Sequence, residues 1–225
     1  MFDTVLIAGL GLMGGSMAKT IKARTLSRVL GWNRTRATAE QALADGSIDA
    51  IATEALYKEA DLVIIGLYPQ ATVDWLLENM PKMKKGCVIV DMVGVKQFMV
   101  DHLEQAALDA GVHYVGGHPM AGSEKTGYES STDHLLENAY YIITPTKKST
   151  PEQIDRIRQV ALGIGALPIV LDYHEHDFSV AAISHLPHLV ASSLVNLVHD
   201  NDSKDEIMKR LVDAHALQTV HELLR

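Results

Sequence analysis

The chain has 225 residues, with 20 basic and 28 acidic side chains and a net charge of −8 when histidine is neutral. This length allows one or two domains, and a content of 47% hydrophobic and 21% charged residues excludes a mainly disordered chain. The acidic balance offers no basic surface for phosphates, so nucleic acid is not an expected partner. The single cysteine, Cys87, excludes an internal disulfide, and no Cys/His spacing predicts a metal site.

Neither a secretion signal nor a membrane span is expected. Asp3 and Gly9 interrupt the N-terminus before an apolar run of signal-peptide length can form. The longest apolar stretch, residues 180–198, contains Ser184, His185 and His188, whose polar groups are unfavourable in lipid. We therefore expect a buried helix of a water-soluble, cytoplasmic protein without membrane contact.

Apolar, β-branched runs alternate with amphipathic segments over the first two thirds of the chain, as in parallel strands joined by crossover helices. Strands are expected at 4–8, 28–32, 49–53, 61–67, 87–91, 113–117, 140–144 and 167–171. Helices are expected at 12–23, 36–44, from about 69, at 96–110 and from 151. No strand-like run follows residue 171, so the sequence predicts an α/β domain over 1–170 and an all-helical domain over 171–225.

A glycine-rich turn follows the first expected strand and opens the first expected helix. Its pattern is Gly9-x-Gly11-x-x-Gly14, with Leu12 and Met13 inside it. The first glycine allows a tight turn, the second lets the backbone approach a pyrophosphate, and the third lets helix and strand pack closely. The phosphates then bind the free N–H groups at the helix N-terminus. The turn predicts a dinucleotide site, whereas the alternative is an ordinary strand–helix connection.

The residue that closes the second strand helps to select the dinucleotide. An acidic side chain there would bind the ribose 2′-hydroxyl and repel a 2′-phosphate. This chain has uncharged Asn33, followed by Arg34 and Thr35, and Arg34 can pair with a phosphate. The cofactor is therefore expected to be NAD or NADP, with a slight preference away from strict NAD use.

A second candidate site follows the strand expected at 113–117. His118 stands between Gly117 and Pro119, and this glycine- and proline-rich frame continues to Gly122. Loops at the carboxyl ends of parallel strands face the ligand crevice. Histidine accepts protons near neutral pH, so His118 is a candidate base, with a structural loop histidine as the alternative.

The long apolar helix contributes further histidines. His185 and His188 are three residues apart and share a face. A metal site there would lack a third ligand at helical spacing, so no metal is expected and the rings need a substrate or structural partners. We expect His174 and His176, near the start of the helix, to be solvated or capping residues without a role in the site.

Three motifs together resemble the prephenate/arogenate dehydrogenase family of tyrosine biosynthesis. They are the glycine turn, the segment His118-Pro119-Met120-Ala121-Gly122-Ser123-Glu124, and Ser184-His185-Leu186-Pro187-His188. The resemblance extends from residue 2 to about residue 200. It implies a Rossmann-type, doubly wound, mainly parallel sheet followed by a smaller helical dimerisation domain. The implied reaction is the oxidative decarboxylation of prephenate to 4-hydroxyphenylpyruvate, with hydride transfer to NAD or NADP.

The resemblance also implies roles for individual residues. His118 matches the histidine that holds and deprotonates the ring 4-hydroxyl, and His188 matches a second catalytic histidine. The substrate-binding matches are Ser123, Glu124, Ser184 and His185. The cofactor-binding matches are Gly9, Gly11, Leu12, Met13, Gly14, Asn33, Arg34, Thr35 and a strand-end segment near the nicotinamide, formed by Leu67, Pro69 and Thr72.

Two departures from the family pattern leave other readings open. Gly94 occupies the place of a serine that contacts the catalytic histidine or substrate in many members. The segment carrying a substrate-binding arginine does not occur between residues 202 and 225, and the helical domain is shorter than usual. The alternatives are an arogenate dehydrogenase or a catalytically weak or silent nucleotide-binding relative.

Two further expectations concern rival enzymes and assembly. A reductase of small hydroxy or imino acids would need a lysine on the interdomain helix, and residues 172–198 contain none. The helix at 180–198 is apolar nearly all round, which one small domain cannot cover. We therefore expect a homodimer formed through the helical domain.

Overall fold

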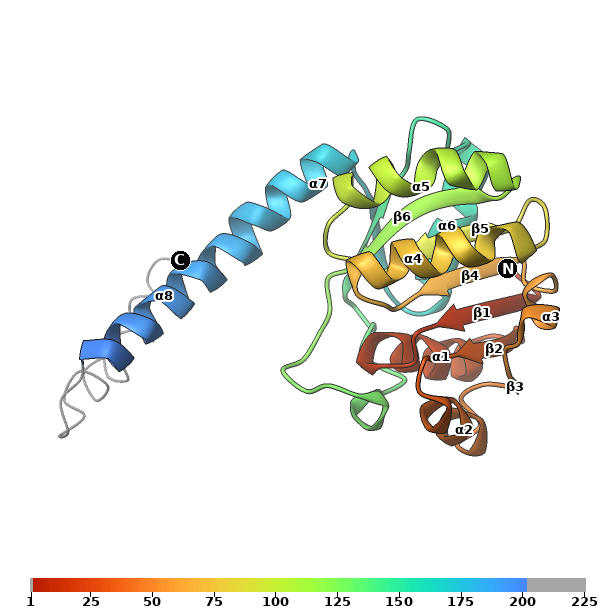
Figure 1. The fold of residues 1–225 in the computed structure, drawn as a ribbon, viewed down its shortest axis with the longest axis horizontal. Coiled ribbons are helices and arrows are strands. Elements are labelled where there is room, and N and C mark those ends of the chain that lie inside the picture. Colours follow the sequence, from red (N-terminus) through yellow and green to blue (C-terminus); the bar gives the residue numbers. More distant parts are fainter. Residues whose placement is uncertain (1, 202–225) are drawn as a thin grey trace. The chain divides into compact units, whose positions relative to one another are not determined.

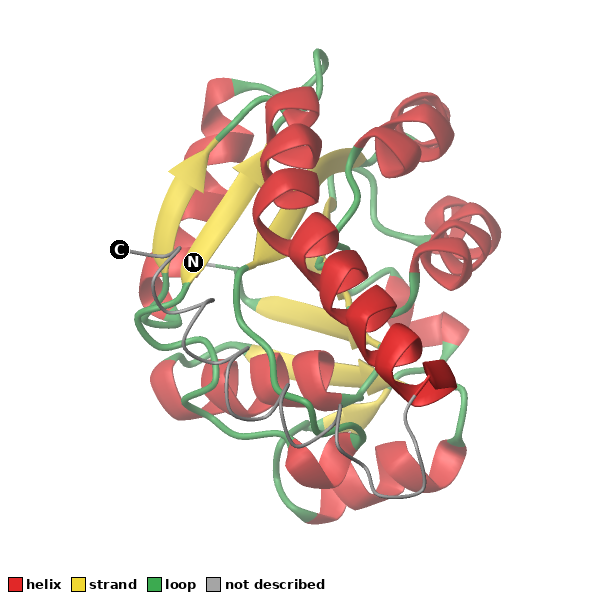
Figure 2. Cartoon of the chain, turned by 90° about the vertical axis from the view of Figure 1, so that its left-hand side faces the viewer, coloured by secondary structure: helices red, strands yellow, loops and turns green. Residues whose placement is uncertain are grey.

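The structure is a computed structural model that describes residues 2–201. The chain divides into two compact units, Met1–Asp177 and Phe178–Arg225. The first unit is an α/β layer structure, and Figure 2 shows helices on both faces of its sheet. The described part of the second unit is helical.

The first half of the chain alternates strands and helices largely as the sequence predicts. The elements are β1 (Thr4–Ala8), α1 (Leu12–Arg24), β2 (Arg28–Trp32), α2 (Arg36–Ala44), β3 (Ala50–Ile51), α3 (Glu54–Tyr57), β4 (Leu62–Ile65) and α4 (Pro69–Asn79). The strand expected at 49–53 is thus only two residues long. Helix α3 was not predicted.

The second half continues the alternation and ends in helices. Its elements are β5 (Val88–Asp91), α5 (Gln97–Ala110), β6 (His113–Pro119), β7 (Tyr140–Thr144), α6 (Pro151–Gly163), β8 (Leu167–Val170), α7 (Tyr173–Val180), a π-helical turn (Ala181–His185) and α8 (Leu186–Asn201). Short 3₁₀ turns lie at Met80–Lys82 and Tyr128–Ser130. Strand β6 continues two residues past its predicted end because its last part pairs with β7.

Within residues 2–201, one sheet contains all eight strands, in the order β3-β2-β1-β4-β5-β6-β7-β8. Every neighbouring pair is parallel except β6 and β7, which are antiparallel. The order reverses between β1 and β4, because the chain runs from β1 outward to β3 and then returns to the other side of β1. In open α/β sheets a ligand crevice lies at such a switch point, at the carboxyl ends of the strands.

Alternate side chains of β1 enter two separate cores. Val5 and Ile7 join a cluster with Met17 of α1 and Ile157 of α6, on one face of the sheet. Leu6 and Ala8 join the opposite cluster, with side chains from α4 and α5; both helices lie across one face of the sheet in Figure 1. Burial on both faces explains why the strands read as continuous apolar runs. The doubly wound, mainly parallel fold is confirmed.

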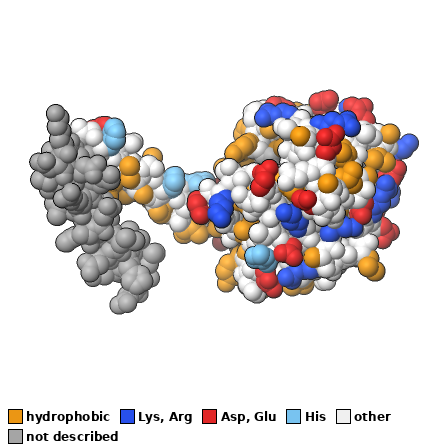
Figure 3. Space-filling model, turned by 90° about the horizontal axis from the view of Figure 1, so that it is seen from below, with side chains coloured by type: hydrophobic (Ala, Val, Ile, Leu, Met, Phe, Trp, Pro, Cys, Tyr) orange, Lys and Arg blue, Asp and Glu red, His pale blue; other side chains and the backbone are white. Residues whose placement is uncertain are grey.

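The helix of the second unit is apolar and exposed in the single chain. Every side chain from Ala181 to Leu197 is exposed, and the sequence predicts that this surface is buried against a second copy of the chain. Apolar side chains are visible along this helix in Figure 3. The expected cover of these side chains is a second copy of the chain, so burial of the helix stays a prediction.

Candidate active site

The glycine turn closes tightly against the end of β4. Gly9 has a positive φ of 94°, which favours glycine. A Cβ on Gly14 would lie 1.8 Å from the carbonyl oxygen of Gly9, and a Cβ on Gly66 would lie 2.9 Å from the same oxygen. The three backbones therefore pack together in a way that only glycine permits.

The opposite side of the turn is open. Gly11 is the N-cap of α1 and has no side-chain cap, and a Cβ there would meet no atom within 4 Å. The first turn, which includes Leu12 and Met13, contains no acidic residue. Its N–H groups and the positive end of the helix dipole therefore face space that fits the phosphates of a dinucleotide.

Asn33, at the end of β2, braces this turn. Its Oδ1 accepts a hydrogen bond from the Leu10 N–H at 3.0 Å, and its Nδ2 donates to the Thr35 carbonyl at 3.1 Å. Arg34 is exposed and takes part in no ion pair among residues 2–201. Asn33 thus holds the turn through its amide, and the strand end carries no carboxylate.

The predicted strand-end segment lies beside the same turn. Helix α4 begins at Pro69, and buried Thr72 donates its hydroxyl hydrogen to the Leu67 carbonyl at 3.1 Å. The Leu67 side chain packs on Gly9, since a Cβ on Gly9 would lie 2.7 Å from Leu67 Cδ2. The structure therefore brings Leu67, Pro69 and Thr72 to the switch point.

His118 lies at the carboxyl end of β6. The first part of this strand pairs with β5, and the last part, residues 116–119, pairs with β7. Strands β1, β4, β5 and β6 are consecutive neighbours and parallel. Three strand spacings separate β1 from β6, or about 14 Å, so the glycine turn and His118 lie along one edge of the sheet.

Gly94 faces the His118 ring, as expected for the position of the family serine. A Cβ on Gly94 would lie 3.6 Å from His118 Nε2 and 3.7 Å from Cε1. A side chain at this position would therefore contact the ring, and glycine supplies no hydroxyl there.

His176 lies beside His118, and the expectation that it is a solvated or capping residue is wrong. Its side chain is fully buried, its Nε2 lies 2.8 Å from His118 Nδ1, and its Nδ1 lies 2.8 Å from Asp177 Oδ1. The signal was present in the sequence: Tyr173, His176 and Val180 have the spacing of one helix face, and all three are buried.

A buried ionic cluster supports the strand that carries His118. The ammonium group of Lys96 donates to Asp91 and, at 2.6 Å, to the Gly117 carbonyl. The Tyr114 hydroxyl donates to the other oxygen of Asp91 at 2.5 Å. Burial lowers the pKa of Lys96, against the attraction of Asp91, and burial together with Asp91 raises the pKa of Tyr114. The cluster fixes the peptide that precedes His118.

The loop after His118 carries Ser123 and Glu124, both exposed. Ser123 Oγ donates to Glu124 Oε2 at 3.4 Å and accepts from the Lys125 N–H at 3.1 Å. Further along, the loop returns to α1, where Lys19 donates to the Ser131 carbonyl at 2.9 Å and the Thr132 N–H donates to Ser16 Oγ at 3.1 Å. The segment after His118 is thereby tied to the helix that follows the glycine turn.

Ser184, His185 and His188 lie on the helix of the second unit and are exposed. Ser184 and His185 belong to the π-helical turn, a feature that is frequent at functional sites. No group of three or more potential metal ligands occurs within residues 2–201. The stretch Tyr173–Leu197 has the length and composition of a membrane-crossing helix, and core helices of water-soluble proteins pass the same criterion.

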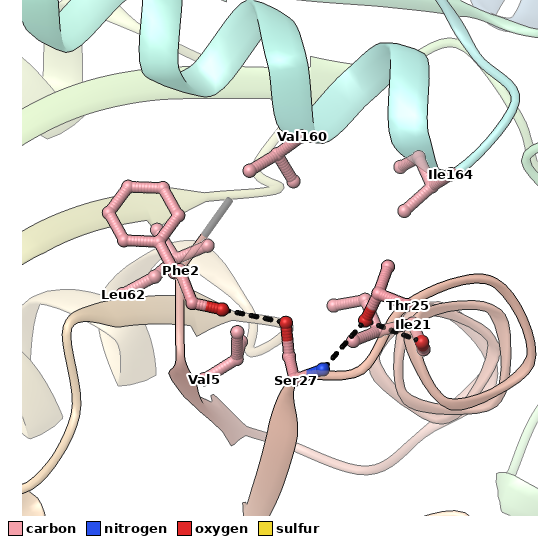
Figure 4. A pocket seen from close by; sticks show the side chains of 8 residues that line it. All are labelled: Phe2, Val5, Ile21, Thr25, Ser27, Leu62, Val160 and Ile164. Atoms are coloured by element: carbon pink, nitrogen blue, oxygen red, sulfur yellow. Dashed lines mark hydrogen bonds between the residues drawn. The ribbon is translucent and has the colours of Figure 1, made fainter.

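A small apolar cavity lies away from this edge. It has a volume of ≈ 10 Å³ and lies between β1, α1 and α6, with Phe2, Val5 and Val160 in its wall (Figure 4). A space of this size holds about one water molecule. Its wall includes Phe2 and Leu62, at the amino ends of the strands, so it is not a substrate site.

Comparisons with known proteins agree with this arrangement. Residues 17–170 match the family model "Prephenate dehydrogenase, nucleotide-binding domain", and residues 172–215 match "Prephenate dehydrogenase, dimerization domain". The prephenate dehydrogenase of Bacillus subtilis is 37% identical over 214 residues, covering 93% of this chain and 57% of that protein. The chain thus spans little more than half the length of this relative.

Solved structures give the same result. The prephenate dehydrogenase of A. aeolicus, in complex with hydroxyphenyl propionate and NAD⁺, superimposes with a TM-score of 0.85 at 28% identity, covering 93% of this chain and 74% of that one. The arogenate dehydrogenase of Synechocystis superimposes with a TM-score of 0.79 at 27% identity, covering 94% and 74%. The family models match most of the chain, and the chain therefore belongs to the prephenate dehydrogenase family.

Proposed function

We propose that this chain catalyses the oxidative decarboxylation of prephenate to 4-hydroxyphenylpyruvate, with hydride transfer to NAD⁺ or NADP⁺, as a cytoplasmic step of tyrosine biosynthesis. The observation that carries the proposal is the placement of His118 at the same sheet edge as the glycine turn, about 14 Å away along the strand ends. A base and a dinucleotide site at one edge are what this reaction needs. Membership of the prephenate dehydrogenase family supports prephenate as the substrate.

The glycine turn holds the dinucleotide in this proposal. The N–H groups after Gly11 bind the pyrophosphate, Gly14 lets α1 approach it, and Asn33 and Arg34 lie at the adenosine end. Leu67, Pro69 and Thr72 flank the path toward His118. When bound, the nicotinamide supplies the acceptor for a hydride.

His118 removes the proton from the 4-hydroxyl of the substrate ring through Nε2. The electrons released on the oxygen favour departure of the hydride from the same carbon. The bond to the ring carboxylate then breaks, carbon dioxide leaves, and the ring becomes aromatic. His118 returns the proton to the phenolic oxygen, so the base is regenerated and the proton balance closes.

The remaining predicted residues act on the substrate's other groups. Ser123 and Glu124 are placed on the loop after β6, and Ser184, His185 and His188 on the helix of the second unit. We assign them contacts with the carboxylates and the side chain of the substrate. Arogenate differs by an amino group in place of the keto group, and similarity to the Synechocystis arogenate dehydrogenase keeps it as the second candidate substrate.

A homodimer is part of the same proposal. The exposed apolar side chains of α8 include Leu189, Val190 and Leu197, each more than half exposed. The match to a dimerization-domain model over residues 172–215 supports a second copy of this chain as their cover. Sedimentation at micromolar concentration is expected to give twice the mass of 24.6 kDa; a monomer would contradict this part.

The activity is tested by mixing the purified protein with prephenate or arogenate and each oxidised dinucleotide, and following the absorbance of the reduced nicotinamide. Reduction with prephenate and formation of 4-hydroxyphenylpyruvate is the expected result. Reduction of the dinucleotide with arogenate but not with prephenate would identify arogenate as the substrate. Dinucleotide binding without reduction by either substrate would leave only a nucleotide-binding protein and contradict the proposal.

A further inference from the structure

A continuous chain of hydrogen bonds leads from a carboxylate to His118. Asp177 Oδ1 lies 2.8 Å from His176 Nδ1, and His176 Nε2 lies 2.8 Å from His118 Nδ1. His176 is completely buried and His118 is half-buried. The two rings meet edge to face, with centroids 5.1 Å apart. The geometry therefore links the orientation of His118 to the start of α7.

The direction of the first hydrogen bond follows from what else binds Asp177. The backbone N–H groups of Lys96 and Gln97, at the start of α5, donate to its two oxygens at 2.7 and 2.8 Å. Backbone N–H groups can only donate, so the carboxylate accepts from both. Although burial alone would raise the pKa of Asp177, these bonds and His176 hold it below the ordinary value. An ionised Asp177 requires the proton of His176 to be on Nδ1.

The direction of the second hydrogen bond follows from the charge state of His176. Burial lowers the pKa of this ring; the neighbouring Lys96 ammonium acts in the same direction, and Asp177 opposes both. A neutral ring with its proton on Nδ1 has a lone pair on Nε2. That lone pair accepts from His118, whose proton is then on Nδ1, and His118 Nε2 is left as the basic nitrogen.

Two neighbouring residues, Gly94 and Lys96, bear on how the His118 ring is oriented. Gly94, next to His118 Nε2, has no hydroxyl to orient the ring. Lys96 connects the parts, since its N–H donates to Asp177 and its ammonium donates to the Gly117 carbonyl. The hydrogen bond with His176 orients the ring from its Nδ1 side.

We propose that His176 and Asp177 are positioning residues that fix the ring orientation of His118 and place its proton on Nδ1, so that Nε2 faces the substrate as the base. The role rests on the proposed function, because it assigns the partner of that base. It resembles the general arrangement in which a carboxylate sets the tautomer of a catalytic histidine, here extended by one imidazole.

The tautomer can be read without any activity. In protein labelled with ¹⁵N-histidine, two-bond ¹H–¹⁵N correlation spectra distinguish protonated from unprotonated ring nitrogens, and His118→Asn identifies the signals of His118. The expected wild-type pattern at slightly alkaline pH is a proton on His118 Nδ1 and none on Nε2. The reverse tautomer would overturn the inference, even if the protein proved inactive.

Kinetics supply the second test, with a matched pair of variants. His176→Leu removes the acceptor, whereas His176→Gln keeps an acceptor oxygen near the position of Nε2. We expect His176→Leu to lower kcat about 10- to 100-fold, as for loss of other outer partners of functional histidines, with KM nearly unchanged. His176→Gln is expected to recover most of kcat. Circular dichroism and thermal melting establish that both variants fold.

The pH profile separates positioning from a merely structural role. The groups that face His176 are Asp177 on its own helix, His118 on β6, Asp91 at the end of β5 and Lys96 at the N-cap of α5. Loss of the acceptor weakens the hydrogen bond of protonated His118, so the acid limb of kcat/KM should move to lower pH in His176→Leu and stay in His176→Gln. If the wild-type protein is active and His176→Leu leaves both kcat and the acid limb unchanged, the positioning role alone is refuted. If the wild-type protein is inactive but His118 has the expected tautomer, only the proposed function is refuted.

Discussion

Gly11 and Gly14 stand three residues apart in one turn, yet a side chain would meet different surroundings at each. At Gly14 a Cβ would lie 1.8 Å from a backbone oxygen, and at Gly11 it would meet no atom within 4 Å. Gly14→Ala should therefore lower the free energy of unfolding by about 3 kcal/mol. Gly11→Ala should fold normally but weaken dinucleotide binding at least about tenfold.

Urea unfolding and dinucleotide titration of the two variants measure these effects separately. Gly11→Ala serves as the control for stability, because its backbone is extended and accepts a side chain. Equal dinucleotide affinity in Gly11→Ala and wild type would show that phosphates do not approach this side of the turn.

Lys96 and Asp91 form a buried ion pair. Both side chains are fully buried, so Lys96→Met would leave the Asp91 carboxylate without its counter-charge. Removal of one partner of such a pair typically lowers the free energy of unfolding by about 3–5 kcal/mol. Arg36→Met, which breaks the exposed pair with Glu40, is the control. Equal changes of the denaturant midpoint in Lys96→Met and Arg36→Met would contradict a stabilising role of the buried Lys96–Asp91 pair.

The positions of candidate residues were predictable where a local motif marks them and not where a long-range contact does. The glycine pattern marks the turn after β1, and the strand end with its glycine and proline neighbours marks the place of His118. His176 was missed because the pairing with His118 joins residues 58 positions apart, and such a contact leaves no local pattern. Its burial, in contrast, could have been inferred from its helical spacing with Tyr173.

Helix α6 begins with a cap made by two of its own side chains. Thr150 and Gln153 form a reciprocal capping box, in which the Thr150 hydroxyl accepts from the Gln153 N–H and the Gln153 side chain accepts from the Thr150 N–H. Thr150→Ala should lower the free energy of unfolding by about 1 kcal/mol. Thr53 is an N-cap without a side-chain cap bond, so Thr53→Ala should change stability much less. Chemical denaturation of the two variants compares the losses, and equal losses would contradict the capping role.

Strands and helices were largely predictable because burial on both sheet faces leaves apolar runs. The antiparallel direction of β7 was not, since the run Tyr140–Thr144 carries no signal for direction. The length of β3 also depends on its neighbour, because only Leu30 and Gly31 pair with it. Exposure of α8 in the single chain was anticipated from its apolar character on nearly all sides, but periodicity does not show what covers such a surface.

At the scale of the whole molecule, buried His176 makes stability depend on pH. Burial lowers its pKa in the folded state, so below about pH 6.5 the unfolded chain binds a proton that the folded chain does not. Stability should therefore fall as pH decreases from about 6.5. Asp177, whose pKa is also lowered, contributes stability above about pH 3.9 that is lost as pH falls further.

Urea midpoints measured between neutral and acid pH test this dependence. His176→Gln should flatten the decrease that begins near pH 6.5, because it removes the group that resists protonation. His134→Gln replaces an exposed histidine and should keep the wild-type slope. Identical slopes in all three proteins would show that His176 is not the group responsible.

The proposed reaction depends on His118 as the base at the edge of the sheet. The most direct measurement is the turnover of prephenate by His118→Asn, with dinucleotide affinity determined on the same sample. We expect turnover to fall by about 10²–10⁴, the usual contribution of a positioned base, while dinucleotide affinity stays at the wild-type value. Turnover equal to that of the wild-type protein would contradict the role of His118 as the base.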